Sequence, residues 1–221
     1  MAADMARQGW HVLPQVLDPT DCSAFRGAYD DDAWYRRTVV MQRHGFGRGE
    51  YRYFRYPLPD RLATLREAFY PPLAHLANEW AGQLGRAQLY PGDHATYLAQ
   101  CALAGQSRPT PLILRYRVGD YNCLHQDLYG AEHFPFQIAI LLSQPGEDFE
   151  GGEFVIVEQR PRMQSRAHVV PLRQGDAIVF AVNEAPRAGT RGTYRVKLRH
   201  GVSEVRAGER FTLGVIFHDA S

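Results

Sequence analysis

Lysine, cysteine and long apolar runs are all scarce in this chain of 221 residues. Of its 25 basic residues one is a lysine, Lys197, so 24 are arginines, and 24 acidic residues leave a formal net charge of +1. This near balance excludes a protein that attracts nucleic acid through bulk positive charge. Codon usage is the simplest explanation for most of the arginines, and a minority is expected to recognise carboxylate or phosphate with the planar guanidinium.

The three cysteines, Cys22, Cys101 and Cys123, are odd in number and lack C-x-x-C spacing. That pattern excludes a disulfide framework and a zinc knuckle, and it predicts reduced thiols. No apolar run approaches the roughly 18 residues of a membrane span. Because MAADMARQGWHV at the start lacks the apolar core of a signal peptide, we predict a cytoplasmic protein with no membrane partner. The oligomeric state stays open.

The first half of the chain, residues 1–110, carries helix signals. Asp18-Pro19 opens a helix that extends to about residue 29, and Asp60 caps another that Pro71-Pro72 interrupts. We expect this half to be a helical or lid portion integrated with the core of a single domain. Two further helices are predicted at 73–84 and 93–105.

From residue 111 onward, short β runs follow one another between Gly, Pro and Asp turns. This spacing predicts an antiparallel sandwich or barrel. Helices first and strands afterwards indicate an α+β fold in which the N-terminal helices buttress one sheet. The predicted strands cover 111–118, 135–142, 152–159, 168–172, 176–182, 193–198, 201–205 and 211–217.

One motif in the β half offers metal ligands. His125 and Asp127 stand two positions apart, so their side chains point to the same side of an extended segment. His200, on a distant predicted strand, supplies a third ligand. Two histidines and one carboxylate form the facial triad of non-haem Fe(II) oxygenases, which leaves coordination positions open. On its own, such a motif more often reflects a buried histidine and a turn aspartate.

Two further residues suit a dicarboxylate whose other end chelates the metal. Arg210 follows His200 by ten residues on a predicted strand, where a buried guanidinium pairs bidentately with a carboxylate. Tyr116 precedes His125 by nine residues and is placed to donate its hydroxyl to the same group. The alternatives are an exposed charge at the strand end for Arg210 and a packed core ring for Tyr116.

In this order, RYRVGDYNCLHQD, FEGGEF, PLRQGDAIVF and RHGVSEVRAGERFTLGVIFHD resemble the 2-oxoglutarate/Fe(II)-dependent dioxygenases. The resemblance implies a double-stranded β-helix (jelly-roll) catalytic core over 111–221. It also implies Fe(II), 2-oxoglutarate and O2 as cofactor and cosubstrates, with no catalytic side chain beyond the metal ligands. The implied ligands are His125, Asp127 and His200, and Arg210 and Tyr116 fall where the family binds the cosubstrate.

The sequence also resembles, more narrowly, a bacterial oxygenase family that is grouped with nucleic-acid-modifying members. This resemblance covers the stretch from LHQDLYGAEHFPF to PLRQGD and extends into the N-terminal half through RYFRYPLP. LRYRVGDYNCLHQD is similar in spacing to alkylation-repair demethylases of the AlkB type. The sequence departs from them at Leu114, where those enzymes place an asparagine against the cosubstrate. The interval from His200 to Arg210 is more similar to prolyl 4-hydroxylase-type oxygenases.

Arginines and aromatic residues alternate between residues 48 and 56, within a stretch from Trp34 to Tyr56 that has six arginines and one acidic residue, Glu50. Such interleaving suits phosphate contact and base stacking. Two alternatives stand side by side: a lid that grips a base, or an amphipathic strand that covers the sheet. The predicted substrate-binding residues are Arg48, Tyr51, Arg52, Tyr53 and Arg55.

These features predict an Fe(II)- and 2-oxoglutarate-dependent dioxygenase that demethylates alkylated bases in single- or double-stranded DNA or RNA. The alternative keeps the enzyme class and changes the substrate to a protein side chain, as in prolyl 4-hydroxylases, or to a small metabolite. A jelly-roll that binds metal or nucleic acid without catalysis is the remaining hypothesis.

Overall fold

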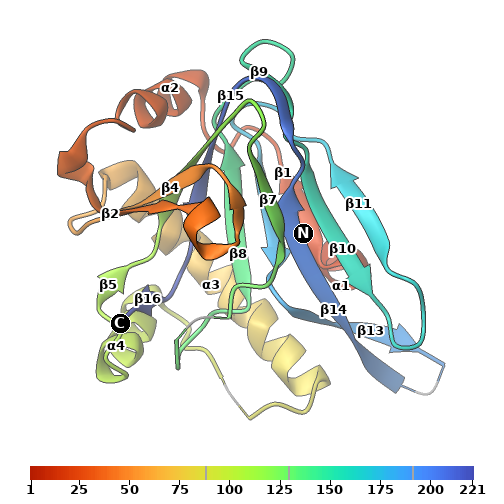
Figure 1. Cartoon of the computed structure of the whole chain (residues 1–221). Coiled ribbons are helices and arrows are strands. Elements are labelled where there is room, and N and C mark those ends of the chain that lie inside the picture. Colours follow the sequence, from red (N-terminus) through yellow and green to blue (C-terminus); the bar gives the residue numbers. More distant parts are fainter. Residues whose placement is uncertain (88, 129, 191) are drawn as a thin grey trace.

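Two antiparallel sheets that face each other form the body of the molecule (Figure 1). The computed structural model describes residues 1–87, 89–128, 130–190 and 192–221. The larger sheet contains, in spatial order, β1 (Trp10–Leu13), β12 (Ala177–Ala181), β8 (Phe136–Leu141), β15 (Val205–Val215), β6 (Leu112–Arg117), β4 (Glu50–Phe54) and β2 (Tyr35–Val40), with β9 (Phe149–Gly151) also paired to β15.

The smaller sheet completes a sandwich around a central cavity. Its order is β11 (Arg166–Val170), β10 (Phe154–Gln159), β14 (Gly192–Val202), β7 (Tyr121–His125) and β3 (Gly47–Arg48), with β13 (Glu184–Gly189) also paired to β14. A separate short ribbon joins β5 (Arg108–Pro109) to β16 (Asp219–Ala220). The predicted α+β class and jelly-roll core are confirmed.

Burial along the strands follows from this layering. Along β10, buried and half-buried residues alternate, as expected for a strand with one face on the core. All six residues of β8 are buried, because the larger sheet is covered on one face by helices and on the other by the smaller sheet. The period-two pattern in the sequence therefore located most strands of the second half.

Side-chain caps begin two of the three helices for which the sequence predicted a cap. The prediction for Asp60 is wrong, because Asp60 is the first residue of its helix, Asp60–Gln83, and the N-cap residue Pro59 makes no side-chain hydrogen bond. Asp18 accepts a hydrogen bond from the N–H of Asp21 at 2.8 Å, and Asp93 accepts one from Thr96 at 2.8 Å.

Within the described parts of the chain, no helix is long and apolar enough to span a bilayer. The shorter helical elements are α1 (Ala2–Gln8), α2 (Pro19–Gly27), α4 (His94–Leu103) and the 3₁₀ turns η1 (Asp32–Trp34) and η2 (Met41–His44).

The expected helix break at Pro71-Pro72 is wrong, because α3 runs without interruption over Asp60–Gln83. Both prolines lie on its exposed side, where water can bind the carbonyls that lose their amide partners. The opposite side packs on the larger sheet, with the Trp80 ring 4.9 Å from that of Phe136. Burial on that side outweighs the local cost of two prolines.

Strands from the first half of the chain extend both sheets. β1 pairs with β12, and β4 pairs with β6, so that the cavity is bounded partly by residues before 110. Of the two alternatives for residues 48–56, the strand is the one observed over Glu50–Phe54. Its alternation sends Tyr51 and Tyr53 toward the cavity.

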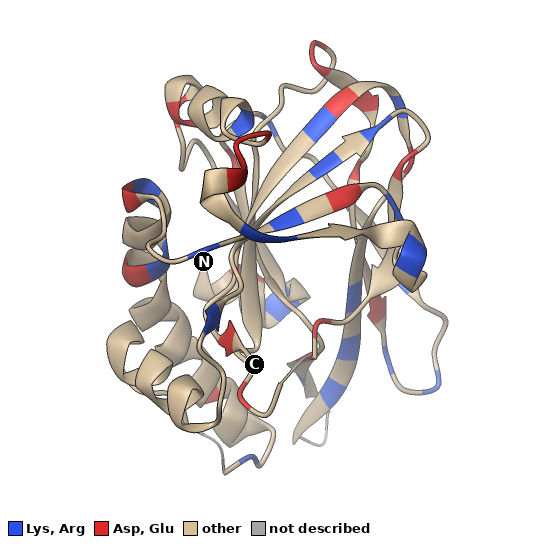
Figure 2. Cartoon of the chain, turned by 60° about the vertical axis from the view of Figure 1, so that its left-hand side comes forward, with Lys and Arg blue, Asp and Glu red and all other residues tan. Residues whose placement is uncertain are grey.

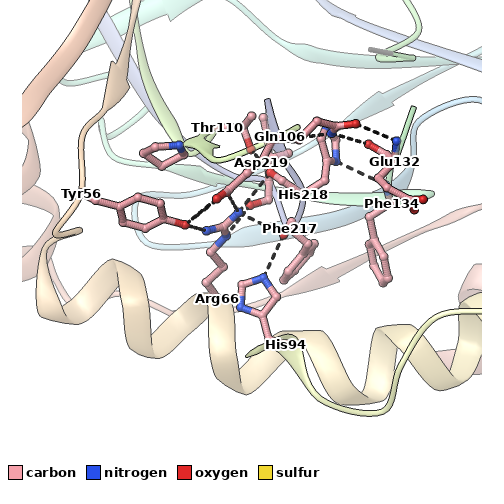
Figure 3. A network of polar contacts seen from close by, with 12 residues as sticks. Tyr56, Arg66, His94, Gln106, Thr110, Glu132, Phe134, Phe217, His218 and Asp219 are labelled. Atoms are coloured by element: carbon pink, nitrogen blue, oxygen red, sulfur yellow. Dashed lines mark hydrogen bonds and ion pairs between the residues drawn. The ribbon is translucent and has the colours of Figure 1, made fainter. Parts of the chain in front are cut away.

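The segment after β15 is held against α3 by the buried side chain of Arg66 (Figure 3). Its guanidinium donates to the carbonyls of Ile216 at 2.8 Å, Phe217 at 3.0 Å and His218 at 3.1 Å, and to Asp219 Oδ1 at 2.7 Å. The Tyr56 hydroxyl completes the set. One side chain thus fixes the four residues 216–219, two of which border the cavity.

Replacing Arg66 by alanine should lower the free energy of unfolding by about 3–5 kcal/mol, because it leaves the Asp219 carboxylate buried without its cation. Chemical denaturation in urea measures the change. The matched control is Arg61→Ala on the same helix, whose ion pair with Asp21 is largely exposed and is worth about 1 kcal/mol or less. Equal stability of the two variants would contradict a structural role for the Arg66 network.

Candidate metal centre

Two histidines and an aspartate converge at one end of the smaller sheet. His125 ends β7 and lies directly opposite His200 of β14 in the strand register, so their rings approach to 4.2 Å between centroids. Asp127 follows two residues after β7. Its Oδ1 lies 3.4 Å from His125 Nε2, and its Oδ2 lies 3.5 Å from His200 Nε2. The three ligand atoms all lie within 4.8 Å of one another.

Surrounding groups fix the orientation of both imidazoles. His125 Nδ1 lies 2.8 Å from the carbonyl oxygen of Cys123, which can only accept, so Nδ1 carries the proton and Nε2 keeps its lone pair. The His200 ring is packed against Phe180, with 4.6 Å between centroids, and stacks on Phe154. Both Nε2 atoms therefore face Asp127, as ligands of one ion must.

The electrostatics favour the metal-binding protonation states of His200 and Asp127. Burial, with a smaller contribution from the His125 charge, lowers the pKa of His200 although the Asp127 carboxylate raises it, which favours the neutral imidazole. Burial tends to raise the pKa of Asp127, but the two histidines and the Gln137 amide together lower it to about 2. Two imidazole nitrogens and one carboxylate oxygen fit a non-haem Fe(II) ion and leave one side of it open.

Arg210 and Tyr116 lie directly opposite each other on β15 and β6. The Arg210 guanidinium is fully buried, donates to Thr212 Oγ1 at 2.6 Å and lies 5.6 Å from the Tyr116 ring. Within the described residues it has no carboxylate partner, and its Nε makes no hydrogen bond. Burial lowers the pKa of Arg210 to about 10. A buried cation of this kind calls for an anion supplied from outside the chain.

The Tyr116 hydroxyl is buried as well and makes no hydrogen bond of good geometry to the described residues, although the Asn122 side chain lies beside it. Burial raises its pKa, so the hydroxyl stays a donor. The guanidinium and this hydroxyl border the same cavity as the histidine–aspartate cluster. Together they suit a dicarboxylate that stretches from the metal to Arg210.

A glycine makes room for the arginine. A Cβ atom at Gly152, whose φ is +60°, would lie 2.8 Å from Cδ of Arg210 and 2.9 Å from the side chain of Val205. Any larger residue would therefore displace the stem of the guanidinium. The Gly151-Gly152 turn in FEGGEF thus leaves the space that the Arg210 side chain occupies.

The cavity that holds these groups measures about 340 Å³ and is mostly apolar. Leu112, Leu114 and Ile138 form one wall, and Leu114 brings no hydrogen-bonding group to the position where AlkB-type enzymes place an asparagine. Tyr51 and Tyr53, which lie opposite Leu114 and Leu112 on the adjacent strand, and Phe46 form the aromatic part of the lining, with the two tyrosine rings 5.3 Å apart and perpendicular. An apolar chamber of this kind excludes water around the metal centre.

The predicted substrate-binding residues separate into two groups. Tyr51 and Tyr53 line the cavity, but Arg52 points to the opposite side of the sheet, where it donates to Thr38 and packs over the Tyr35 ring. Arg48 is exposed, with Nε 4.0 Å from Asp120, and Arg55 is exposed beyond the end of β4. The structure therefore brings the two tyrosines to the site and does not bring Arg52 there.

His218 also lines the cavity, a position that the sequence analysis did not identify. Arg210, Thr212, Gly214, Ile216, His218 and Ala220 all line the cavity, so the period of two continues through the end of β15 and beyond. That alternation, counted onward from Arg210, was the available signal. The Phe134 N–H donates to His218 Nδ1 at 3.3 Å, and burial together with the Arg66 charge lowers the pKa of His218 to about 4.

A family model covers most of the chain. Residues 49–220 match Oxygenase-NA, described as "Oxygenase, catalysing oxidative methylation of damaged DNA". An uncharacterized protein of Mycobacterium tuberculosis H37Rv is 46% identical over 220 residues, spanning 100% of this chain and 89% of that protein. The counterpart in strain CDC 1551 matches equally well.

Solved structures share the fold at low sequence identity. A prolyl-4-hydroxylase of Pseudomonas putida superposes with a TM-score of 0.58 at 14% identity, covering 99% of this chain and 97% of that one. An oxidoreductase of the 2OG-Fe(II) oxygenase family from Burkholderia pseudomallei gives 0.56 at 18% identity, covering 100% and 90%. The α-ketoglutarate-dependent epimerase SnoN gives 0.58 at 16% identity, covering 99% and 80%.

Proposed function

We propose that this chain, which belongs to the Oxygenase-NA family and is a 2-oxoglutarate/Fe(II)-dependent oxygenase, demethylates alkylated bases in DNA or RNA. One observation carries the substrate assignment: the cavity that holds the metal ligands also has an aromatic lining of Phe46, Tyr51 and Tyr53. Stacking of a base on such rings is worth about 1–3 kcal/mol per base.

We assign the metal to His125, Asp127 and His200. When bound, Fe(II) supplies the activation of O2 coupled to oxidative decarboxylation of 2-oxoglutarate to succinate and CO2, one oxygen atom entering succinate and the other a substrate C–H bond. The Cys123 carbonyl holds His125 in the tautomer that presents Nε2 to the ion. Asp127 contributes one negative charge, which offsets half the charge of a divalent cation.

The chain's other task is to position the organic cosubstrate. In our assignment Arg210 and Tyr116 bind the far carboxylate of 2-oxoglutarate, with Thr212 holding the guanidinium in place. The apolar wall of Leu112, Leu114 and Ile138 keeps water away from the reacting groups. Hydroxylation of an N-methyl group then yields an unstable hydroxymethyl amine, which releases formaldehyde and the unmethylated base. No side-chain acid or base is required.

The test follows two products of one reaction. Iron-loaded protein with 2-oxoglutarate is incubated with N-methylated oligonucleotides of DNA and RNA, single- and double-stranded, and with their unmethylated counterparts. We expect equimolar succinate and formaldehyde with the methylated strands, and mass spectrometry of the digested strands should show the parent base. Succinate accompanied by a gain of one oxygen on a peptide or metabolite, with the methylated bases left intact, would overturn the substrate assignment and support the hydroxylase alternative.

A further inference from the structure

Two adjacent arginines of β2, Arg36 and Arg37, lie beside the cavity-lining residue Tyr53, at a point where the strand is irregular. Tyr35 lies opposite Phe54 and Arg37 opposite Tyr53, so Arg36 is an extra residue on β2. A β-bulge of this kind bends its strand and redirects side chains, often next to a functional site. Here it sets both arginines beside Tyr53, whose ring lines the cavity.

Contacts to β4 and β5 fix Arg36 in this position. Its Nε donates to the Pro109 carbonyl at 2.9 Å, and its guanidinium carbon lies 4.6 Å from the centre of the Tyr53 ring. Arg108, the residue before Pro109, lies opposite Ala220 in the β5–β16 ribbon, and Ala220 also lines the cavity. In Figure 2, where this side of the molecule comes forward, the start of β2 is blue.

The positive charges of these three arginines are not neutralised by the described part of the chain. Arg36, Arg37 and Arg108 form no ion pair with any described carboxylate, whereas Arg52 of β4 and Arg115 of β6 each do. Burial lowers the pKa of Arg36, the Tyr53 side chain opposes this shift, and the charges of Arg108 and Arg37 lower the pKa further, so each of these two guanidinium groups repels that of Arg36. The nearby Asp219 carboxylate is engaged by Arg66 and Tyr56.

We propose that Arg36, Arg37 and Arg108 form a binding site for a phosphodiester group of the nucleic acid, next to the nucleotide whose base enters the cavity. This inference rests on the proposed function. The guanidinium fork matches phosphate oxygens bidentately, and an anion bound there would offset the repulsion that Arg37 and Arg108 exert on Arg36. Because Arg36 packs on the Tyr53 ring, the phosphate site lies next to the aromatic lining of the cavity. A nucleotide could therefore place its phosphate at the arginines and its base against the aromatic rings.

The test compares two double variants that remove the same charge. Arg37→Ala/Arg108→Ala takes away two unpaired cations, and the control, Arg117→Ala/Arg206→Ala, takes away two exposed arginines that already face Glu209 and Glu153. Fluorescence anisotropy measures the dissociation constant of a methylated single-stranded oligonucleotide at several salt concentrations, without O2 so that turnover does not occur. Steady-state demethylation of the same strand gives KM and kcat.

We expect the first variant to raise the dissociation constant about 10- to 100-fold, the range for lost hydrogen bonds to a charged group. The slope of the logarithm of the association constant against the logarithm of the salt concentration should fall in magnitude by about 0.7, the value for one phosphate contact on a single strand. KM should rise together with the dissociation constant, and by a larger factor than kcat falls. The control variant should match the wild type in all measurements. Circular dichroism and thermal melting verify that both variants are folded.

The possible outcomes separate this inference from the proposed function. If wild type demethylates the strand and Arg37→Ala/Arg108→Ala binds it with unchanged affinity and salt slope, the phosphate site is wrong and the proposed function stands. If wild type binds strands through these arginines but releases no formaldehyde, the site stands and the proposed reaction fails. If wild type binds no oligonucleotide, or binds an acidic peptide in its place, both are overturned.

Discussion

Replacing Asp127 by alanine is expected to weaken Fe(II) binding by more than about 100-fold and to abolish succinate formation. Even the groups that only orient a metal ligand are worth about 10- to 100-fold in metal affinity, and Asp127 is placed to be a ligand itself. Its carboxylate also lies within 3.5 Å of the Nε2 atoms of both histidines, so without it two imidazoles face each other and repel once they bind protons.

Anaerobic titration with Fe(II), followed by calorimetry, measures this affinity directly and does not depend on knowing the substrate. Glu147→Ala is the matched control, since it removes an exposed carboxylate from the turn between β8 and β9. A folded Asp127→Ala protein that still binds one equivalent of Fe(II) with the affinity of the wild type would refute the ligand assignment.

Replacing Arg210 by methionine is expected to have opposite effects on binding and on stability. The apparent affinity for 2-oxoglutarate should fall by about 30-fold to several thousand-fold, equivalent to the roughly 2–5 kcal/mol lost when one partner of a buried charge pair is truncated. The free protein should be at least as stable as the wild type, because its guanidinium is buried with Thr212 as hydrogen-bond partner and no carboxylate among the described residues.

Thermal melting with and without 2-oxoglutarate and Mn(II) reports both effects, since a ligand that binds the folded state raises the melting temperature by an amount that grows with the logarithm of its affinity. Tyr116→Phe should cost less, about 2- to 10-fold, as expected for one hydrogen bond. Arg210→Met protein that melts well below the wild type while binding 2-oxoglutarate normally would show that Arg210 serves the fold and not the cosubstrate.

The parts of this site that the sequence predicted are those set by local spacing. His125 and Asp127 are two residues apart, and an extended backbone leaves such side chains on one side. The position of His200 opposite His125 depends on the pairing of β14 with β7, which no local pattern contains. In that case the order of the motifs along the chain, compared with a known family, supplied what local physics could not.

The errors arose where tertiary contacts override local preference. Pro71 and Pro72 favour a helix end, but buried residues on the other side of α3 keep the helix whole. Arg52 belongs to the segment that suggested a nucleic-acid contact, and alternation along β4 turns it toward the Asp32 carboxylate and away from the cavity. Arg36, which packs on the cavity-lining Tyr53 ring, is placed there by a bulge that has no sequence signature.

The chain passes from the smaller sheet to the larger one between β14, which carries His200, and β15, which carries Arg210. Each of these two proposed anchors for the cosubstrate therefore lies on a strand that is paired within its own sheet, and Gly152 leaves room for the stem of Arg210. The separation of the two proposed anchors is therefore set by the backbone and not by flexible loops. If they hold 2-oxoglutarate as proposed, we expect keto diacids one methylene shorter or longer to bind more weakly.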